Sequence, residues 1–232
     1  MEIKKTKILE VAVILVLSAA LVCMIVPVEA QRFVRIYVDQ PLGYIPGVEP
    51  GETVTVDIII EVSGIPDNDV EGIVGWRMDV AVDPSVLGIY EPPRCKGAMI
   101  GYFLNDFRMD WGYPPPTLLP GAGDPDTGYW DDITEMITPT PEGGAGEGYS
   151  GLKLVTLEFY SKSETAYSLV NLINIEYYTA NGVWHPVDEV IDGNYNPPEV
   201  PEFPLGATLE ILFIPVIVYM LWRSKQRKRL TF

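Results

Sequence analysis

Apolar residues stand at every second position from Val54 to Val62, and most of the positions between them are polar. A repeat of two is the period of a β-strand, because successive side chains of a strand point to opposite faces of its sheet. Residues 32–39, 73–83, 152–161 and 169–178 show the same alternation. These runs predict strands with one buried face, and they exclude a helical bundle as the main architecture.

Turn signals separate the alternating runs. Gly and Pro occur 21 times each, a share that long helices do not tolerate. The pair Asn181–Gly182 follows one run directly and is a strong hairpin signal, because Asn and Gly accept positive φ at both central positions of a tight turn. Several short strands with such turns and no long amphipathic helix predict an all-β fold, an antiparallel jelly-roll β-sandwich.

One stretch interrupts this rhythm. Residues 109–150 contain Pro114–Pro116, further prolines and the run Gly143–Gly146. The stretch is too long for a simple connection between strands. We therefore expect a domain over 31–196 that carries an irregular insertion at about 109–150.

The charge of the chain is uneven. The net charge is −16, and residues 31–201 hold 27 acidic but only 8 basic residues. A body this acidic repels phosphate backbones, so we expect no nucleic acid partner. Most of the other basic residues lie close to the two chain ends.

Both ends of the chain have the composition of membrane-directed segments. Residues 1–30 have a basic start, an apolar run at 11–26 and a small residue at Ala30, as in a secretory signal peptide; an uncleaved anchor helix is the alternative. Residues 203–222 are long enough and apolar enough for a transmembrane helix. The basic tail at 223–232 predicts that this end is cytoplasmic and that the body is exported to the cell surface.

A Pro-rich spacer and sorting motif at 197–202 separates the body from the second apolar segment. The tripeptide Pro201, Glu202 and Phe203, followed by an apolar span and a basic tail, resembles the PEF-type C-terminal sorting signal of archaeal surface proteins. That resemblance implies processing by an archaeosortase, which would leave a lipid in place of the helix. The anchor is therefore expected to be either the C-terminal transmembrane helix or a lipid replacing it.

The order of the strand-like pieces resembles a cohesin-like domain, within a wider group that includes carbohydrate-binding sandwiches. The resemblance is carried by four pieces of sequence: Pro50–Val56, Gly75–Leu87, Gly151–Phe159, and the closing Asn181–Gly182 turn with Val190–Gly193. It implies a nine-stranded jelly-roll sandwich that binds partners and performs no chemistry.

Catalysis has little support in the sequence. His185 is the only histidine, and no nucleophile elbow, H-E-x-x-H motif or phosphate loop occurs. A strand residue beside a turn is the simpler interpretation of His185. Pairs of carboxylates do not indicate a glycosidase site here, because 27 acidic residues in the body form such pairs by chance. We predict a protein that is not an enzyme and requires no cofactor.

Two groups of side chains in the insertion are candidate binding residues. Carboxylates at closely spaced positions can supply the oxygen ligands of calcium; a solvated acidic loop is the alternative. Exposed rings could stack on a sugar or anchor a protein partner; a small satellite core is the alternative. The carboxylates are Asp124, Asp126, Asp131 and Asp132, and the rings are Trp111, Tyr113, Tyr129 and Trp130. Trp76 and Trp184 lie in strand-like runs and are expected in the core.

Three functional hypotheses follow. The first is a surface-anchored, cohesin-like module that binds an extracellular protein in adhesion or surface assembly. The second is a module that binds a polysaccharide through the rings of the insertion. The third is a structural component of the cell envelope. Cys95 has no intrachain partner if the first segment, which holds Cys23, is removed.

Overall fold

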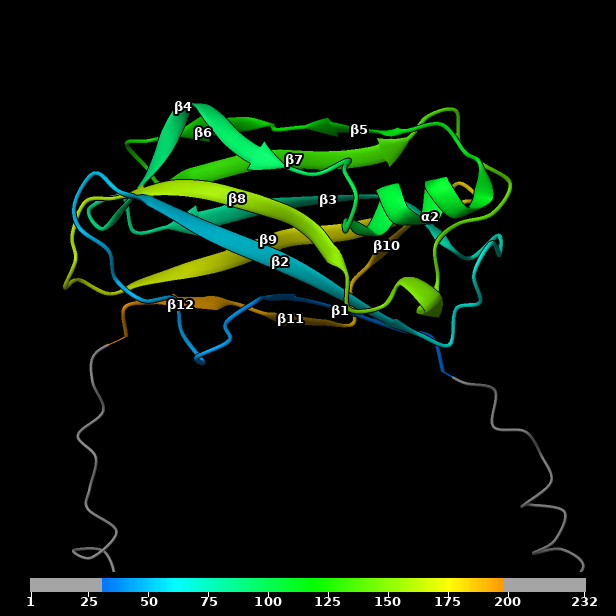
Figure 1. Ribbon diagram of the computed structural model, residues 1–232, viewed down its shortest axis with the longest axis horizontal. Helices are drawn as coiled ribbons and strands as arrows, with labels where there is room; N and C mark the ends of the chain where they lie inside the picture. The colour runs from blue at the N-terminus through cyan, green and yellow to red at the C-terminus, as the bar shows by residue number, and fades with distance from the viewer. Residues whose placement is uncertain (1–30, 198–232) are drawn as a thin grey trace, which may run out of the picture. The chain divides into compact units, whose positions relative to one another are not determined.

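The computed structural model describes residues 31–197 and shows two β-sheets packed face to face (Figure 1). Sheet A has the order β11-β1-β2-β8-β4, and sheet B has the order β10-β9-β3-β7-β5, with β12 paired to β9 and β6 paired to β7. All pairings are antiparallel except that of β1 with β11. The expectation of an all-β, largely antiparallel sandwich is confirmed for this part of the chain.

The strands of sheet A are β1 (Phe33–Val38), β2 (Thr53–Ser63), β4 (Leu87–Lys96), β8 (Lys153–Ser161) and β11 (Glu189–Ile191). Sheet B contains β3 (Ile73–Val82), β5 (Pro116–Leu119), β6 (Ala122–Asp124), β7 (Tyr129–Ile137), β9 (Ser168–Thr179), β10 (Trp184–Pro186) and β12 (Gly193–Tyr195). An α-helix, α2 (Phe103–Trp111), and a 3-10 helix, η1 (Glu147–Tyr149), complete the described elements.

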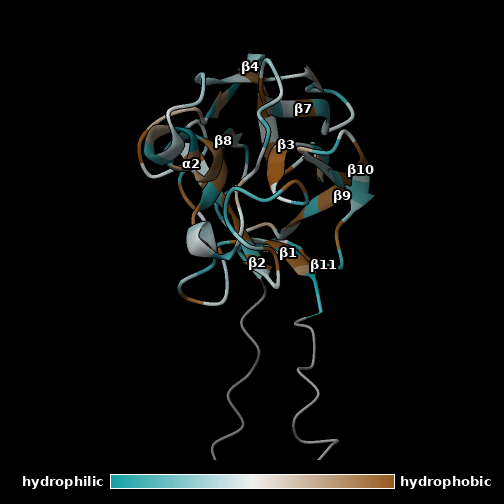
Figure 2. Ribbon diagram, turned by 90° about the vertical axis from the view of Figure 1, so that its right-hand side faces the viewer, coloured by the Kyte–Doolittle hydropathy of each residue, from teal (hydrophilic) through white to brown (hydrophobic). Residues whose placement is uncertain are grey.

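The core lies between the two sheets and follows from the period-two pattern. All the apolar residues at alternate positions of β2, from Val54 to Val62, are buried. The facing layer comes from β3, where Trp76, Met78 and Val80 are also buried. Figure 2 shows hydrophobic residues in brown along strands of both sheets, among them β3. Burial of these two facing layers removes apolar surface from water and stabilises the sandwich.

The expectation of an irregular insertion at 109–150 is wrong. Three strands, β5, β6 and β7, lie in it, and β7 is a central strand of sheet B. The Pro residues at 114–116 and 120 lie at the two ends of β5 and do not prevent the strand from forming. Proline is tolerated at the start of a strand and at sheet edges. Only the connections between these strands are irregular.

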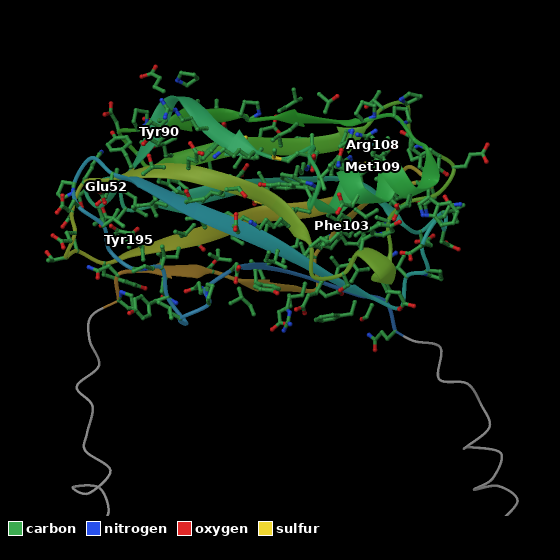
Figure 3. All side chains as sticks on the ribbon, in the orientation of Figure 1. Glu52, Tyr90, Phe103, Arg108, Met109 and Tyr195 are labelled. Atoms are coloured by element: carbon green, nitrogen blue, oxygen red, sulfur yellow. The ribbon has the colours of Figure 1, made fainter. Side chains whose placement is uncertain are left out.

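Two further elements were not expected. Strand β4 contains Pro92 and Pro93, and its pairing with β8 shifts register between Ile89 and Arg94, so that the prolines lie where no ladder hydrogen bond is needed. Helix α2 covers one end of the sandwich, with Phe103 buried and Met109 exposed (Figure 3). Gly112, at φ 74°, ends the helix in the left-handed conformation that glycine accepts easily.

Both ends of the described chain leave from one edge of the sandwich, the edge formed by β1, β11 and β12 (Figures 1 and 2). Strands β4, β5 and β6 form the opposite edge (Figure 1). Within residues 31–197, no helix has both the length and the apolar composition needed to cross a bilayer. The expected signal peptide, C-terminal helix, basic tail and PEF-type motif lie outside the described residues.

Candidate functional site

The outer face of sheet B carries a hollow of about 530 Å³. Its lining residues come from β3, β7, β9 and β10: Arg77, Asp79, Asp132, Asn174, Ile175, Glu176 and Pro186. We call it the Asp79 hollow. It has room for one or two side chains of a partner, and three carboxylates and one guanidinium give its lining a net charge of −2.

Two β-bulges shape the Asp79 hollow, one in each strand beside β3. Met78 pairs with Ile133 and Val80 with Trp130, so Asp79 alone lies opposite two residues of β7. On the other side, the register of β3 with β9 shifts between Arg77 and Asp79. A bulge places one extra residue in its strand and redirects the side chains beside it. Both neighbouring strands therefore bend at the level of Asp79.

Each bulge supplies a residue with positive φ, Asp132 at 52° and Asn174 at 51°. This left-handed conformation is uncommon for residues other than glycine and least costly for Asn and Asp. The backbone N–H of Asp132 donates to Asp79 Oδ1 at 2.9 Å, and Asn174 Nδ2 donates to Asp79 Oδ2 at 2.7 Å. The hydroxyl of Tyr129 donates to the same Oδ2 at 2.7 Å.

Three donors thus fix the Asp79 carboxylate at the base of the hollow. Partial burial raises the pKa of Asp79, but the hydrogen bonds from Tyr129, the Asp132 backbone and Asn174 outweigh it, and the pKa lies below its ordinary value. Asp79 is therefore ionised at neutral pH and is a rigid acceptor. The hydrogen bond to Asp79 is also the main reason that the pKa of Tyr129 is raised.

Arg77 closes one side of the Asp79 hollow. Its guanidinium forms an ion pair with Glu176 on the neighbouring strand and lies over the ring of Trp184, 4.7 Å from the ring centroid. Trp184 in turn packs on Tyr178 with 5.0 Å between ring centroids. Trp184 is only partly buried, so its expected place in the core is wrong, whereas Trp76 is fully buried as expected.

His185 lies in strand β10, beside the Asn181–Gly182 turn as expected. Arg32 donates to its Nδ1 at 3.0 Å, and its ring stacks on Tyr177 at 5.4 Å. Burial, and then the charge of Arg32, lower the pKa of His185. Because the Nδ1 lone pair accepts a hydrogen bond from Arg32, it is not free to take a proton from a nucleophile. The same hydrogen bond connects the N-terminal end of the sandwich to the β9–β10 hairpin.

The four predicted aromatic residues do not form one cluster. Trp130 is fully buried and donates to the carbonyl oxygen of Pro120, so an external ligand cannot reach it. Tyr113 packs on Phe107 below α2, with ring centroids 5.6 Å apart. Tyr129 belongs to the Asp79 hollow. Trp111 alone of the four is well exposed, at 47%.

The four predicted calcium ligands are also separated. Asp124 Oδ1 accepts the backbone N–H of Asp126 at 2.9 Å, and Asp131 accepts the N–H of Ala122 at 3.2 Å. Asp132 faces the Asp79 hollow. Across residues 31–197, no group of three or more His, Cys, Asp or Glu side chains is placed to hold a metal ion.

The alternation of apolar and polar residues did not identify Asp79 as a site residue. The neighbouring strand β9 nevertheless carries a sign of the bulge beside Asp79. Along β9 the buried residues are Val170 and Leu172, then Ile175 and Tyr177, so the alternation changes phase in between. Such a phase change marks a bulge. Leu169 is in phase with Ile175 and Tyr177 along the strand, but it is exposed for the same reason.

Two titratable groups lie between the sheets at the edge formed by β4 and β5. Glu135 is fully buried; its Oε2 accepts the indole N–H of Trp76 at 3.0 Å, and its Oε1 has no hydrogen-bond partner among the described residues. Burial raises the pKa of Glu135 to about 7. Cys95 forms no disulfide in this part of the chain, and burial, with smaller effects of Glu135 and Glu158, raises its pKa to about 11.

No protein-family model matches the chain, and no curated protein matches it. Among solved structures, a second type II cohesin module from the adaptor ScaA scaffoldin of Acetivibrio cellulolyticus has 13% identity and a TM-score of 0.49, covering 75% of this chain and 95% of that one. A non-cellulosomal cohesin from the archaeon Archaeoglobus fulgidus has 14% identity and a TM-score of 0.44, covering 70% and 89%.

Proposed function

We propose that this protein is a non-catalytic, cohesin-like binding module of the cell surface, and that it binds an extracellular protein through the outer face of sheet B. In this proposal the Asp79 hollow is the centre of the binding face. The module needs no cofactor. Its role is adhesion or assembly at the surface.

The fixed Asp79 carboxylate is the observation that carries the proposal. Three donors hold it in place, so its position costs little additional ordering when a partner binds. Around it, Asp132 and Glu176 add negative charge on the same face. A surface of this kind fits a partner that presents basic or hydrogen-bond-donating side chains, because complementary charge steers association and fixes register.

A polysaccharide ligand has less support. Sugar binding by the predicted rings needs several exposed rings on one surface. Trp130 is buried and Tyr113 packs below α2, which leaves Trp111 as the exposed member of the set. The protein partner therefore remains the first proposal.

The proposed location follows from the two chain ends. Residues 1–30 direct export, and residues 203–222, or a lipid that replaces them after processing by an archaeosortase at Pro201–Phe203, hold the body at the outer surface. The basic residues of 223–232 support this orientation, because Lys and Arg are enriched on the cytoplasmic side of a membrane segment. In this arrangement the sandwich meets partners outside the cell.

Two cross-strand ion pairs provide a matched experiment. Arg77 and Glu176 lie on the outer face of sheet B, and Arg35 and Glu61 lie on the outer face of sheet A. Exchanging the members of a pair (R77E/E176R or R35E/E61R) keeps the composition and the ion pair between those two residues while it inverts the local charge pattern. In each variant the arginine also loses a second contact, with Trp184 for Arg77 and with Glu189 for Arg35. Each variant is immobilised as the detergent-solubilised full chain and used to capture proteins from a cell-surface fraction.

The proposal predicts that a protein captured by the wild type is lost with R77E/E176R and retained with R35E/E61R. Equal loss with both variants, or retention with both, would contradict sheet B as the binding face. A parallel array of surface glycans tests the alternative. Binding to a glycan that Trp111→Ala removes, together with no protein capture, would favour the polysaccharide.

A further inference from the structure

A second hollow, of about 370 Å³, opens at the edge of the sandwich where β4 ends sheet A and β5 ends sheet B. We call it the edge hollow. Its lining includes two cations and one carboxylate together with apolar residues: Arg94, Lys96, Glu158, Pro93, Leu118 and Pro120. The charges of this lining sum to +1, whereas those of the Asp79 hollow sum to −2. The edge hollow therefore favours an anionic group, although the body as a whole is acidic.

Arg94 is the available cation of the edge hollow. Among the described residues it forms no ion pair. Its guanidinium lies over the ring of Tyr90 (Figure 3), 4.0 Å from the ring centroid. That ring is itself held, because the Tyr90 hydroxyl is hydrogen-bonded to Thr53 Oγ1 at 2.8 Å and the ring packs on Tyr160 with 5.3 Å between centroids. A guanidinium held over a fixed ring loses less conformational freedom when it binds a ligand.

Lys96 differs from Arg94 because it already has a partner. It forms an ion pair with Glu158, whose side chain is only 14% exposed. The charge that remains for a ligand is thus that of Arg94. A planar guanidinium offers parallel N–H donors that match the two oxygens of a carboxylate. We therefore expect the edge hollow to recognise a carboxylate group.

The edge strands beside the hollow do not favour a peptide as the carrier of that carboxylate. A peptide that adds to the edge of a sheet pairs with a row of free N–H and C=O groups. In β4, Pro92 and Pro93 lack the N–H, and the pairing of β4 with β8 shifts register beside them. Strand β5 begins at Pro116 and is followed directly by Pro120. Recognition at this edge therefore depends on side chains, which suits a saccharide better than an added strand.

We propose that the edge hollow binds a uronic acid unit of an acidic polysaccharide. The Arg94 guanidinium donates two hydrogen bonds to the carboxylate of the unit, and Pro93, Leu118 and Pro120 contact the C–H groups of its ring. Sites for small ligands combine apolar walls with a few fixed polar groups in this way. One exposed arginine–carboxylate contact adds little affinity, so the ligand is a polymer that repeats the carboxylate along its length. This site is separate from the Asp79 hollow and goes beyond the proposed protein partner.

The test measures retention of the full chain, in a non-ionic detergent, on immobilised polygalacturonate. The fully methyl-esterified polymer is the uncharged control, and polyglutamate presents the same carboxylate on a peptide. Arg94→Gln removes the guanidinium, and Arg94→Lys keeps the charge without the paired donors. Arg108→Gln is the matched control, since Arg108 also forms no ion pair among the described residues and lies on α2, outside the lining of the edge hollow.

We expect polygalacturonate to retain the wild type and Arg108→Gln equally, Arg94→Gln several-fold less, and Arg94→Lys to an intermediate degree. Equal loss with Arg94→Gln and Arg108→Gln would overturn the site, because it would show that only the net charge of the chain matters. Equal retention on the methyl ester would overturn recognition of the carboxylate. Stronger retention on polyglutamate would make an acidic peptide the ligand and overturn the saccharide. Absence of retention of the wild type would overturn the inference as a whole and leave protein capture through sheet B untouched.

Discussion

Replacing Glu135 with Gln should stabilise the sandwich above pH 7 and leave its stability unchanged near pH 4. Glu135 lies between the sheets with the Trp76 indole as its one hydrogen-bond donor of normal geometry among the described residues. The backbone N–H of Ala98 also lowers the pKa of Glu135, but burial is the largest effect and the pKa is raised. Glutamine keeps an oxygen for Trp76 and never carries the charge.

The size of the effect follows from the pKa. Burial raises the pKa of Glu135 from 4.5 to about 7, which at 1.36 kcal/mol per pKa unit corresponds to about 3 kcal/mol. Because the pKa in the folded state is raised, the stabilisation is fully present below pH 4.5 and is lost as the pH rises through 7. The wild type should therefore lose up to about 3 kcal/mol of stability between pH 4.5 and pH 8 from this one group.

The assay is guanidinium unfolding of residues 31–197, followed by tryptophan fluorescence at pH 4, 6, 7 and 8.5. Glu52→Gln, at an exposed carboxylate just before β2, controls for the loss of one negative charge. The expected result is a gap between Glu135→Gln and the wild type that opens between pH 4.5 and pH 8. A variant that is less stable than the wild type at pH 8.5 would refute the reasoning, because it would mean that the buried carboxylate is stabilised by its charge.

Three other changes test separate parts of the structure. Phe107→Ala should cost about 3–5 kcal/mol in guanidinium unfolding, since Phe107 is fully buried and packs edge-on against Tyr149; a cost under 1 kcal/mol would show that α2 is not part of the core. Asp79→Ala should cost about 1–3 kcal/mol by leaving the Tyr129 hydroxyl and a backbone N–H without their acceptor, and partner capture should be lost; unchanged capture would separate Asp79 from binding. Alkylation of Cys95 by iodoacetamide should remain slow until the pH approaches its pKa of about 11; rapid reaction at pH 8 would contradict its burial.

The sequence predicts the parts of the fold that depend on a local pattern. Strand β2 was expected because its alternation is unbroken over the whole run. The β9–β10 hairpin was expected from Asn181–Gly182 and is present, but of these two residues only Gly182 has the positive φ that was expected of both. Strand β4 was missed because Pro92 and Pro93 interrupt it, and only its pairing with β8 shows that a bulge accommodates them.

The Asp79 hollow could not be predicted in the same way. The three donors to Asp79 lie 50, 53 and 95 positions from it in the sequence. A pattern within one strand holds no information on which other strand becomes its neighbour. The predicted aromatic residues show that closeness in sequence does not imply closeness in the fold. Trp130 was grouped with Trp111 because the two are close in sequence, whereas the position of β7 between β3 and β5 places Trp130 in the core.

Site-specific photocrosslinking in cells that produce the chain tests the binding face most directly. A benzoylphenylalanine is placed at Thr134, which pairs with Arg77 beside the Asp79 hollow, or at Thr55, which lies on the outer side of β2 in sheet A. Binding through the outer face of sheet B predicts a discrete protein adduct from position 134 and none from position 55. An adduct from position 55 alone would contradict it.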